Sequence, residues 1–410
     1  MNFFTYIGLT PEEFNEKYVN AGLITVNTHD EFPLNIYNYS RKCVQEQIWD
    51  EVTSKCRGII VHCTTGEVIA RPFEKFHNYG ALVGAYAGAG GPQAKGATGE
   101  PVIWEKMDGF MCTLYIWEGV NYLASKGSFH STHAKWATAW YNKAFPKDGP
   151  SPAWPQGWTP VFEGIMPDLR IVVNYGTRNQ LVLLALVNNE TGEEYGPDAL
   201  GALGMEFNLD TPKLFDMTLE QARQKTLQEM PNPDRLDEGF VLTWYRKGQT
   251  PFRLKMKFVE YLRLHRLVTN VSPKHIWDVM SQNQTIEMNE YLTNSTPWFK
   301  KFVEKWQRAL KSEYIRLEGQ AIARFFEEKT AVDKKFLDAM ANVTLAGGTP
   351  YVDMGGLRKE YALAFTKPEN EEFSSIMFAL LDKKDIRPII WRQVKPMTKN
   401  ARPLVNGFAY

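Results

Sequence analysis

The first two-thirds of the chain alternates short apolar and aromatic runs with turn residues, which is typical of antiparallel strands. Two hairpins are predicted, with residues 58–63 and 67–72 around Thr64-Thr65-Gly66, and residues 111–117 and 121–125 around Glu118-Gly119. Further strands are predicted at residues 170–174, 181–187, 239–245 and 253–258. With helical excursions between the strands, the expected fold is α+β, with antiparallel sheets flanked by helices.

After about residue 268 the pattern changes to helical periodicity. Thr296 is a good N-cap, and Pro297 suits the first helical turn. Apolar residues then recur every three or four positions, namely Phe299, Val303, Trp306, Leu310, Tyr314, Leu317, Ala321 and Phe325. Further helices are predicted around residues 371–385 and 387–394. We therefore expect a catalytic domain over residues 1–268 and an all-helical C-terminal domain over residues 269–410.

Composition limits what this fold can do. Lys and Arg total 47, and Asp and Glu also total 47, so the formal net charge is zero. A protein that binds nucleic acid through its overall field is strongly basic, so any such contact must be local here. The four cysteines form no CxxC spacing, which fits a reducing compartment and does not favour a zinc site.

The chain shows no sign of a membrane segment. Its start, Met1-Asn2-Phe3-Phe4, has no basic segment followed by an apolar core. No stretch approaches the ~18 uninterrupted apolar residues of a membrane helix. The sequence therefore predicts a cytoplasmic protein without membrane association, and we expect a monomer.

Two glycine-containing segments need comment because they could be mistaken for phosphate loops. Residues 84–99 lack the GxxxxGK[ST] arrangement that cradles a triphosphate. Residues 149–160 are rich in Pro, Gly and Trp and are typical of an extended connection. Both are interpreted as parts of insertions, near residues 84–100 and 143–160.

The candidate chemistry begins at Lys106, because a neutral lysine amine can attack a phosphorus atom held in line with it. Lys106, Asp108 and Gly109 form the KxDG signature of covalent nucleotidyltransferases. The glycine permits a tight backbone path, and the acid can organise a metal-bound triphosphate and help set the lysine's proton state. A random chain of this length would contain the pattern about once in ten cases, so alone it also fits a surface turn.

Other charged groups follow in an order that suits phosphoryl transfer. Glu163 and Glu238 could hold a ribose and a hydrated metal, and the pair Lys255 and Lys257 could neutralise a triphosphate. The two lysines share one face of a strand because side chains alternate with period two. Each residue singly fits a structural or solvent-facing role better, whereas the set favours a nucleotide site.

With these residues in place, the chain resembles the phage-type RNA ligase 1 family of covalent nucleotidyltransferases over roughly residues 35–268. The motifs that carry the resemblance, besides those above, are Cys56-Arg57-Gly58-Ile59, Arg71-Pro72-Phe73-Glu74-Lys75-Phe76-His77-Asn78, Ser125-Lys126-Gly127-Ser128, and Phe162-Glu163 with Arg170-Ile171-Val172. Two departures are Met107, where an acidic residue is usual, and Phe110, where a small hydroxyl residue is common.

The resemblance implies an ATP-dependent RNA ligase in which Lys106 becomes linked to AMP. The residues that it places at the nucleotide are Arg57, Lys75, Lys255 and Lys257 on the phosphates, Glu163 on the AMP ribose, and Tyr37 at its border. Lys126 is a further candidate for nucleotide binding, with a solvated lysine at a strand end as the alternative. Glu238 would help hold Mg²⁺, with Mn²⁺ as an alternative, through its water shell. Lys106, Glu238, Lys255 and Lys257 are the expected catalytic set.

The implied substrate is RNA with 5′-phosphate and 3′-hydroxyl ends, with a cleaved tRNA as one candidate. If a phage encodes the chain, it would act in the host cytoplasm. The sequence leaves alternatives open, namely a DNA ligase, a GTP-using capping enzyme, or a protein that binds nucleic-acid ends without catalysis. The first two usually carry an oligonucleotide-binding barrel, and the helical C-terminal domain argues against them.

The C-terminal domain carries its own candidate surface. Lys301, Lys305 and Arg308 fall at i, i+4 and i+7 of the long helix, so they form one basic stripe. This stripe could lie along an RNA backbone, which makes the domain a candidate for RNA-substrate recognition. A solvated helix face is the competing interpretation.

Overall fold

The computed structural model describes residues 1–79, 98–146, 152–169, 171–228, 237–262, 265, 271–283, 299–351 and 353–396. Residues 297–298, 404–405 and 408–409 are described by their backbone alone. Thr296, Arg170 and nearly all of the glycine-containing segment at 84–99 lie outside these residues. The chain divides into two compact units, Met1–Val268 with Leu404–Phe408, and Thr269–Pro403 with Ala409–Tyr410.

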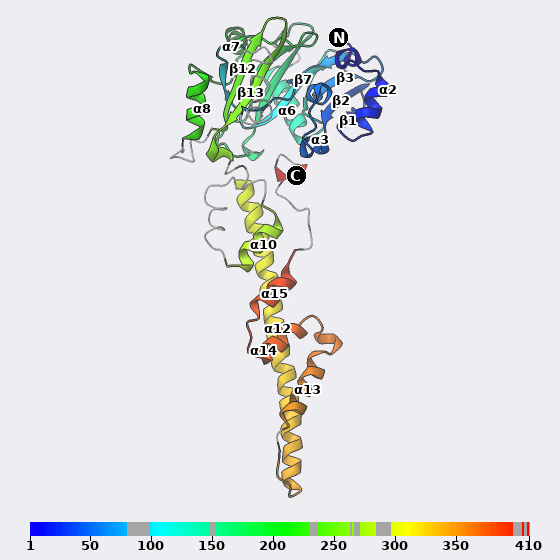
Figure 1. The fold of residues 1–410 in the computed structure, drawn as a ribbon, viewed down its shortest axis with the longest axis vertical. Helices are drawn as coiled ribbons and strands as arrows, with labels where there is room; N and C mark the ends of the chain where they lie inside the picture. Colours follow the sequence, from blue (N-terminus) through cyan, green and yellow to red (C-terminus); the bar gives the residue numbers. More distant parts are fainter. Residues whose placement is uncertain are drawn as a thin grey trace. The chain divides into compact units, whose positions relative to one another are not determined.

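The first unit is built on three sheets, in which most neighbouring strands are antiparallel (Figure 1). The first has the order β1 (Ile24–Thr28), β2 (Leu34–Tyr39), β3 (Arg57–His62) and β4 (Val68–Ala70). The second has the order β10 (Gln180–Asn188), β9 (Trp158–Ile165), β7 (Phe110–Trp117) and β8 (Val120–Ser125). The third has the order β11 (Leu214–Phe215), β6 (Val102–Lys106), β12 (Gly239–Arg246), β13 (Gln249–Lys257) and β5 (His77–Asn78), and β5 joins β13 in parallel.

Helices flank these sheets. They are α1 (Phe3–Ile7), α2 (Pro11–Phe14), the π-helix η1 (Asn15–Val19), α3 (Arg41–Gln45), α4 (Glu51–Lys55), α6 (Thr132–Ala144), the 3-10 helix η3 (Pro167–Leu169), α7 (Pro197–Glu206) and α8 (Leu219–Leu227). Several of them begin where a side chain accepts a backbone N–H, at Asn2, Thr10, Ser40, Asp50, Ser131 and Thr218. The predicted α+β class is confirmed.

Both predicted hairpins are confirmed. Strands β3 and β4 pair on either side of residues 64–66, and β7 pairs with β8 across Glu118 and Gly119. Glu118 and Gly119 have φ values of 49° and 75°. Two positive φ values are what a two-residue turn needs to match the twist of its strands.

Helix α6 covers the sheet of β7 to β10. Its buried Ala137 and Tyr141 pack with Leu114 and Phe162 in one apolar cluster. Because side chains alternate along a strand, Phe162 faces this core and Glu163 faces the other side of the sheet, where it is paired with Met111 of β7. The packing of α6 thus directs Glu163 toward the opposite face.

Two sequence-based predictions need correction. Residues 171–174 belong to no strand, because the backbone N–H groups of Val172 and Val173 donate to a side chain, that of Asp108. The expected insertion at residues 143–160 is also shorter, since α6 continues to Ala144 and β9 begins at Trp158. Within it, Trp154 packs against the α6 core and donates a hydrogen bond to the Tyr141 hydroxyl at 2.7 Å.

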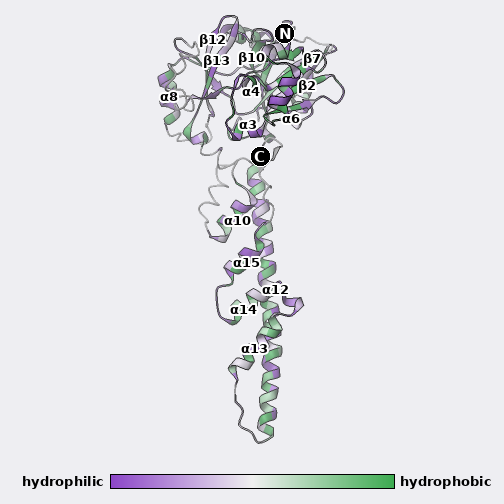
Figure 2. Cartoon of the chain, turned by 45° about the vertical axis from the view of Figure 1, so that its right-hand side comes forward, coloured by the Kyte–Doolittle hydropathy of each residue, from purple (hydrophilic) through white to green (hydrophobic). Residues whose placement is uncertain are grey.

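The second unit is helical. It comprises α10 (Pro273–Ser281), α12 (Pro297–Leu345), α13 (Met354–Phe365), the 3-10 helix η5 (Pro368–Asn370), α14 (Ser374–Leu381) and α15 (Arg387–Val394), and α10, α13, α14 and α15 all contact α12. Strands β14 (Leu404–Val405) and β15 (Phe408–Ala409) pair with each other near the chain end. Figure 2 shows apolar and polar residues interspersed along α12. No helix within the described segments has both the length and the apolar character needed to cross a membrane.

The predicted apolar stripe of α12 is confirmed at its buried positions, which are Phe299, Val303, Leu310, Leu317, Ala321 and Phe325. Farther along, buried Glu328 accepts hydrogen bonds from the Lys367 ammonium at 2.8 Å and the Asn370 amide at 3.0 Å. These polar contacts attach the segment after α13 to the long helix.

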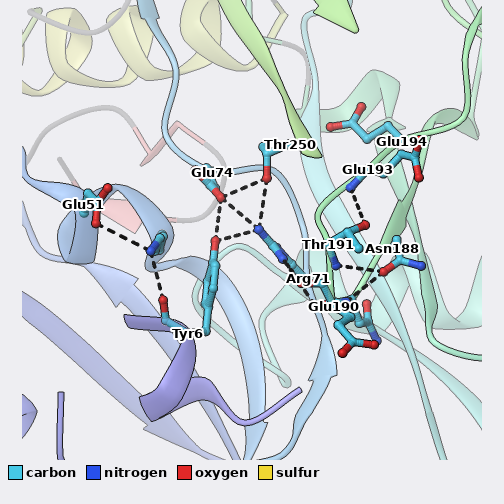
Figure 3. A network of polar contacts seen from close by, with 12 residues as sticks. Tyr6, Glu51, Arg71, Glu74, Asn188, Glu190, Thr191, Glu193, Glu194 and Thr250 are labelled. Atoms are coloured by element: carbon cyan, nitrogen blue, oxygen red, sulfur yellow. Dashed lines mark hydrogen bonds and ion pairs between the residues drawn. The ribbon is translucent and has the colours of Figure 1, made fainter. Parts of the chain in front are cut away.

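One buried arginine ties together distant segments of the first unit (Figure 3). The Arg71 guanidinium, 3% exposed as a residue, donates to the Tyr6 hydroxyl at 2.7 Å and to Glu74 Oε1 at 3.1 Å. It also donates to Thr250 Oγ1 and to the Glu190 carbonyl, each at 3.1 Å. Helix α1, the segment before β5 and the start of β13 therefore meet at one cation.

We predict that Arg71→Met destabilises the first unit by about 3 kcal/mol, because the Glu74 carboxylate and several oxygens lose their buried donor. Peptide-resolved hydrogen exchange would show a loss of amide protection around Tyr6 and Thr250. Arg178→Met is the matched control, since its pair with Asp210 has side chains 28% and 57% exposed, and we expect a change below about 1 kcal/mol. Equal protection in wild type and Arg71→Met would contradict the prediction.

Candidate active site

Three strand ends bring Lys106, Glu238 and Lys257 together. Gly239, the first residue of β12, is paired with Lys106 of β6 on one side and with Lys257 of β13 on the other. Glu238 precedes it, and its two carboxylate oxygens lie 2.8 Å from Lys106 Nζ and 2.8 Å from Lys257 Nζ. One buried carboxylate is therefore shared by two ammonium groups.

Glycine is required next to Glu238. Gly239 has a φ of 150°, and a Cβ atom there would lie 2.0 Å from the Met256 carbonyl oxygen. No other residue fits so close to the neighbouring strand. The same close approach sets Glu238 at the end of β12, between the two lysines.

The backbone after Lys106 is anchored by Asp108. Its carboxylate accepts hydrogen bonds from the Val172 and Val173 N–H groups at 2.9 and 2.8 Å and from the Tyr261 hydroxyl at 2.8 Å. We expected this carboxylate to organise a metal-bound triphosphate; in the structure both of its oxygens accept hydrogen bonds from the protein. Through these bonds Asp108 fixes the turn that follows Lys106.

Burial shapes the protonation of this carboxylate. It raises the pKa of Asp108 to about 6, and the nearby negative charge of Glu238 adds to the shift, while the three donors oppose it. The Asp108 N–H is also bonded, to the Tyr175 hydroxyl at 2.9 Å. The turn is thus held at both its backbone and its side chain.

Glu163 lies close to the lysine turn. Its Oε1 accepts a hydrogen bond from the Gly109 N–H at 3.0 Å. Burial raises the pKa of Glu163 to about 7; Lys106 opposes this shift, and Glu238 adds to it. The structure therefore brings Lys106, Glu163 and Glu238 into one electrostatic group.

Lys106 carries its proton in this arrangement. Burial by itself lowers the pKa of the amine, but the carboxylates of Glu238 and Glu163 outweigh burial and raise it above its ordinary value. The pKa of Glu238 is correspondingly lowered, since Lys106 and Lys257 outweigh the effect of burial. A nucleophilic Lys106 would first have to leave this ion pair and lose a proton.

Four further cations predicted for the site have no carboxylate partner among the residues that the structure describes, namely Arg57, Lys75, Lys126 and Lys255. They come from the start of β3, the segment before β5, the turn after β8, and β13. By contrast Arg253, on the same face of β13 as Lys255, is bonded through two nitrogens to Glu194, at 2.5 and 2.9 Å.

The unpaired cations affect one another. Burial lowers the pKa of Lys255 to about 7, and the charges of Lys106, Lys75, Lys257 and Arg57 add to this effect. The pKa of Lys75 is also lowered, first by burial and then by Arg57 and Lys126, against the opposing Tyr39. The charges of these separate elements therefore lie close enough to act on one another.

A glycine lets two of these elements meet. Gly58, next to Arg57, has a φ of 91°, and a Cβ atom there would lie 2.7 Å from the Lys126 carbonyl oxygen. It is the extra residue where the β2–β3 register shifts. The bulge therefore brings Arg57 and the backbone of Lys126 together.

Tyr37 does not lie among these cations. Its ring stacks on Phe3 at 4.8 Å and meets Phe14 edge to face at 5.2 Å, beneath α1 and α2, and it is 6% exposed. The expectation that Tyr37 borders a nucleotide therefore does not fit its position. Tyr39, at the end of the same strand, accepts a hydrogen bond from Lys126 Nζ at 3.4 Å.

The described residues contain no group of three or more His, Cys, Asp or Glu side chains arranged to hold a metal ion. Glu238 is a carboxylate at the site, and Mg²⁺ commonly binds through one or two carboxylates together with phosphate oxygens and water. The residues present therefore fit a metal that arrives with a phosphate ligand, and do not form a metal cage of their own.

Sequence reasoning missed three aromatic residues that contact the unpaired cations, namely Tyr39, Trp49 and Phe76. Phe76 directly follows Lys75 in the sequence, and Tyr39 lies two residues after Tyr37. Trp49 stands in no motif, and its contact with Lys75 depends on the folded positions of α4 and the segment before β5.

Comparison of the sequence with known proteins finds RNA ligases. Residues 55–262 match the model of a family described as RNA ligase. The RNA ligase of Rhodothermus phage RM378 is 26% identical over 330 residues, covering 67% of this chain and 73% of that protein. A Thermovibrio ammonificans protein named "Putative RNA ligase" is 26% identical over 246 residues, covering 58% of this chain and 60% of its own. The latter match therefore spans less than two-thirds of the relative.

Among solved structures, a Naegleria gruberi RNA ligase mutant with ATP and Mn has a TM-score of 0.36 and 14% identity. The match covers 48% of this chain and 59% of that one. These values are too low to bear on function.

We predict that Lys255→Met stabilises the first unit near neutral pH, because it removes a buried and repelled cation. In the wild type the free-energy cost of holding the Lys255 cation in the folded protein is fully present below pH 7, where folded and unfolded Lys255 are both protonated. Above pH 7 only the unfolded form keeps its proton, so the wild type regains about 2 kcal/mol relative to the variant by pH 9.

Urea unfolding of both proteins at pH 6.5 and pH 9 measures this difference. Lys213→Met is the control, because Lys213 is exposed, and its effect is expected not to change between the two pH values. A stability difference for Lys255→Met that is independent of pH would refute the assignment.

Proposed function

The chain belongs to the RNA ligase family of the phage RNA ligase 1 type, and on that premise we propose that it is an ATP-dependent enzyme that joins RNA ends. The matched residues, 55–262, lie within the first unit. The observation that carries the proposal is the buried group of Lys106, Glu238 and Lys257, surrounded by cations that lack carboxylate partners in the described structure. We propose that Lys106 forms a covalent lysyl-AMP intermediate.

A triphosphate fits the charge of this region. Arg57, Lys75, Lys126 and Lys255 bring positive charge that no carboxylate of the described residues neutralises, and burial, together with their mutual repulsion, lowers the pKa of Lys75 and Lys255. An anionic ligand would relieve this repulsion and favour the protonated form of both lysines. Glu163, near the lysine turn, would bind the AMP ribose.

In the first step the Lys106 amine would give up its proton to solvent after leaving Glu238. Its nitrogen would attack the α-phosphorus of ATP, so that an N–P bond forms and the P–O bond to pyrophosphate breaks. Bound Mg²⁺, or Mn²⁺, would supply charge neutralisation at the phosphate oxygens, with Glu238 holding its water shell. Lys255 and Lys257 would stabilise the leaving pyrophosphate.

In the second step an oxygen of the RNA 5′-phosphate would attack the AMP phosphorus, and Lys106 would be released as the N–P bond breaks. In the third step the RNA 3′-hydroxyl would attack the 5′-phosphorus and displace AMP, giving a phosphodiester. A cleaved tRNA is one candidate substrate. We propose a monomer that acts in the cytoplasm.

We expect wild-type protein incubated with ATP labelled on the α-phosphate to gain an acid-stable label, because the phosphoramidate links AMP covalently to the chain. Lys106→Ala should gain none. Lys55→Ala is the matched control, since the Lys55 side chain is 17% exposed and pairs with Glu51, much as Lys106 is 18% exposed and pairs with Glu238. An unlabelled wild type would contradict the proposal and leave the GTP-using capping enzyme and the non-catalytic end-binding protein as alternatives.

Lys106→Ala should still join RNA that already carries a 5′-adenylate to a 3′-hydroxyl end, because the third step needs no lysine nucleophile. Product formation on denaturing gels measures this. Running the assay on matched DNA ends, and the labelling with GTP, separates the RNA ligase from the DNA ligase and capping-enzyme alternatives. If Lys106→Ala loses the joining of adenylated RNA as well as self-labelling with AMP, Lys106 has a role beyond nucleotide transfer.

We further propose that the second unit contacts substrate RNA through Lys301, Lys305 and Arg308, which are exposed on α12. Replacing all three by Gln should weaken RNA binding and reduce the salt dependence of log K by about 2, since each single-strand phosphate contact contributes about 0.7. Arg324→Gln with Lys335→Gln is the control, because both cations pair with carboxylates of their own unit. Unchanged affinity of the triple variant would exclude this surface.

A further inference from the structure

The four cations that have no carboxylate partner among the described residues each lie against an aromatic ring. Lys75 Nζ is 4.7 Å from the centre of the Trp49 ring, and Lys126 Nζ is 4.6 Å from that of Tyr39. Arg57 and Lys255 lie 5.4 and 5.6 Å from the Phe76 ring. All four distances fall within about 6 Å, where a ring face attracts a cation.

The rings of Tyr39 and Trp49 form one unit. They meet edge to face, with centres 5.1 Å apart and planes at 86°. The Tyr39 N–H donates to the Cys56 carbonyl at 2.8 Å, which fixes the strand end beside Arg57. Two rings that touch each other thus serve two different lysines.

The supports of ring and lysine are shared as well. Trp49 lies just before α4, and the Ser54 carbonyl of α4 accepts the Lys75 N–H at 2.8 Å. Besides contacting the Tyr39 ring, Lys126 Nζ donates to its hydroxyl at 3.4 Å. The backbone of Lys75 is therefore held by the helix that follows its ring, and the side chain of Lys126 is held by the residue that carries its ring.

A ring and a carboxylate hold a lysine with different consequences. A carboxylate competes with an incoming phosphate for the ammonium, as Glu238 does at Lys106 and Lys257. A ring attracts a cation by about 0.5–2 kcal/mol and has no net charge to repel a phosphate. Aromatic partners therefore order the lysines while leaving their charge available to an anion.

We propose that Tyr39 and Trp49 are positioning residues that hold Lys126 and Lys75 in place for the polyphosphate of the nucleotide. The proposal rests on the proposed function for the identity of that ligand. The pKa of Tyr39 agrees with this placement: burial raises it, but Arg57, Lys126 and Lys75 outweigh burial and leave it below its ordinary value. Its hydroxyl therefore lies in the field of the same three cations.

The test compares leucine variants, which remove the aromatic ring at a position, with phenylalanine variants, which keep an aromatic ring there. Trp49→Leu and Tyr39→Leu should each raise the KM for ATP in lysyl-AMP formation about fivefold to tenfold, with kcat changing less, since a lost contact of about 1–1.4 kcal/mol weakens binding by that factor. Trp49→Phe and Tyr39→Phe should stay within about threefold of wild type, because a ring face remains.

Trp158→Leu is the matched control. Trp158 is also half-buried and meets Tyr195 edge to face at 4.9 Å, and no cation–ring contact joins it to the described residues. Its KM should equal that of the wild type. Leucine variants with an unchanged KM, or phenylalanine variants as impaired as the leucine variants, would overturn the proposal.

A double-mutant cycle separates positioning from a general loss of structure. In a Lys75→Met background, Trp49→Leu should have little further effect on binding of inorganic tripolyphosphate, measured by calorimetry, because the lysine it holds is gone. A full additive loss would show a merely structural role. Binding of tripolyphosphate needs no catalysis, so it tests this inference separately from the proposed function. If the wild type binds tripolyphosphate in a way that depends on the two rings but never becomes labelled with AMP, the proposed function is wrong and this inference stands.

Discussion

The carboxylate of Glu238, shared between the ammonium groups of Lys106 and Lys257, is the interaction on which the site depends. Burying one carboxylate costs several kcal/mol, and two charge-assisted contacts of 2.8 Å are needed to offset that cost. The contacts form only because Gly239 lets β12 lie close against β13 while it pairs with β6. Backbone geometry at one glycine thus sets the protonation of the proposed nucleophile.

The remaining cations are organised on the opposite principle, since no described carboxylate pairs with them and they are held by rings and backbone. Burial, and then the repulsion between these charges, lowers the pKa of Lys75 and Lys255, so the arrangement destabilises the folded protein. Natural proteins keep such strain where binding requires it. Arg71 and Arg253, neutralised by Glu74 and Glu194, supply rigid support around the same region. The cations that pair with carboxylates therefore support the fold, and the cations without such partners remain available to bind a ligand.

The sequence predicts the features that depend on local rules. Period two places Lys255 and Lys257 on one face of a strand, and periods of three and four define the apolar face of α12. It fails where a distant contact decides the outcome. Helices α1 and α2 bury Tyr37, and the backbone amides of Val172 and Val173 donate hydrogen bonds to the Asp108 carboxylate. Trp49 contacts Lys75 only in the folded chain. No pattern within a few residues carries these contacts.

The ion pair of Lys106 also explains why a buried lysine nucleophile need not be reactive before its substrate arrives. Free Lys106 is held as an ammonium because Glu238 and Glu163 outweigh its burial. A cationic metal entering with a triphosphate would compete with Lys106 for Glu238, and the same positive charge would lower the amine's pKa. Binding would then both remove the carboxylate that protects the proton and supply the phosphorus to be attacked. Under the proposed mechanism, reactivity is coupled to nucleotide binding through a single carboxylate.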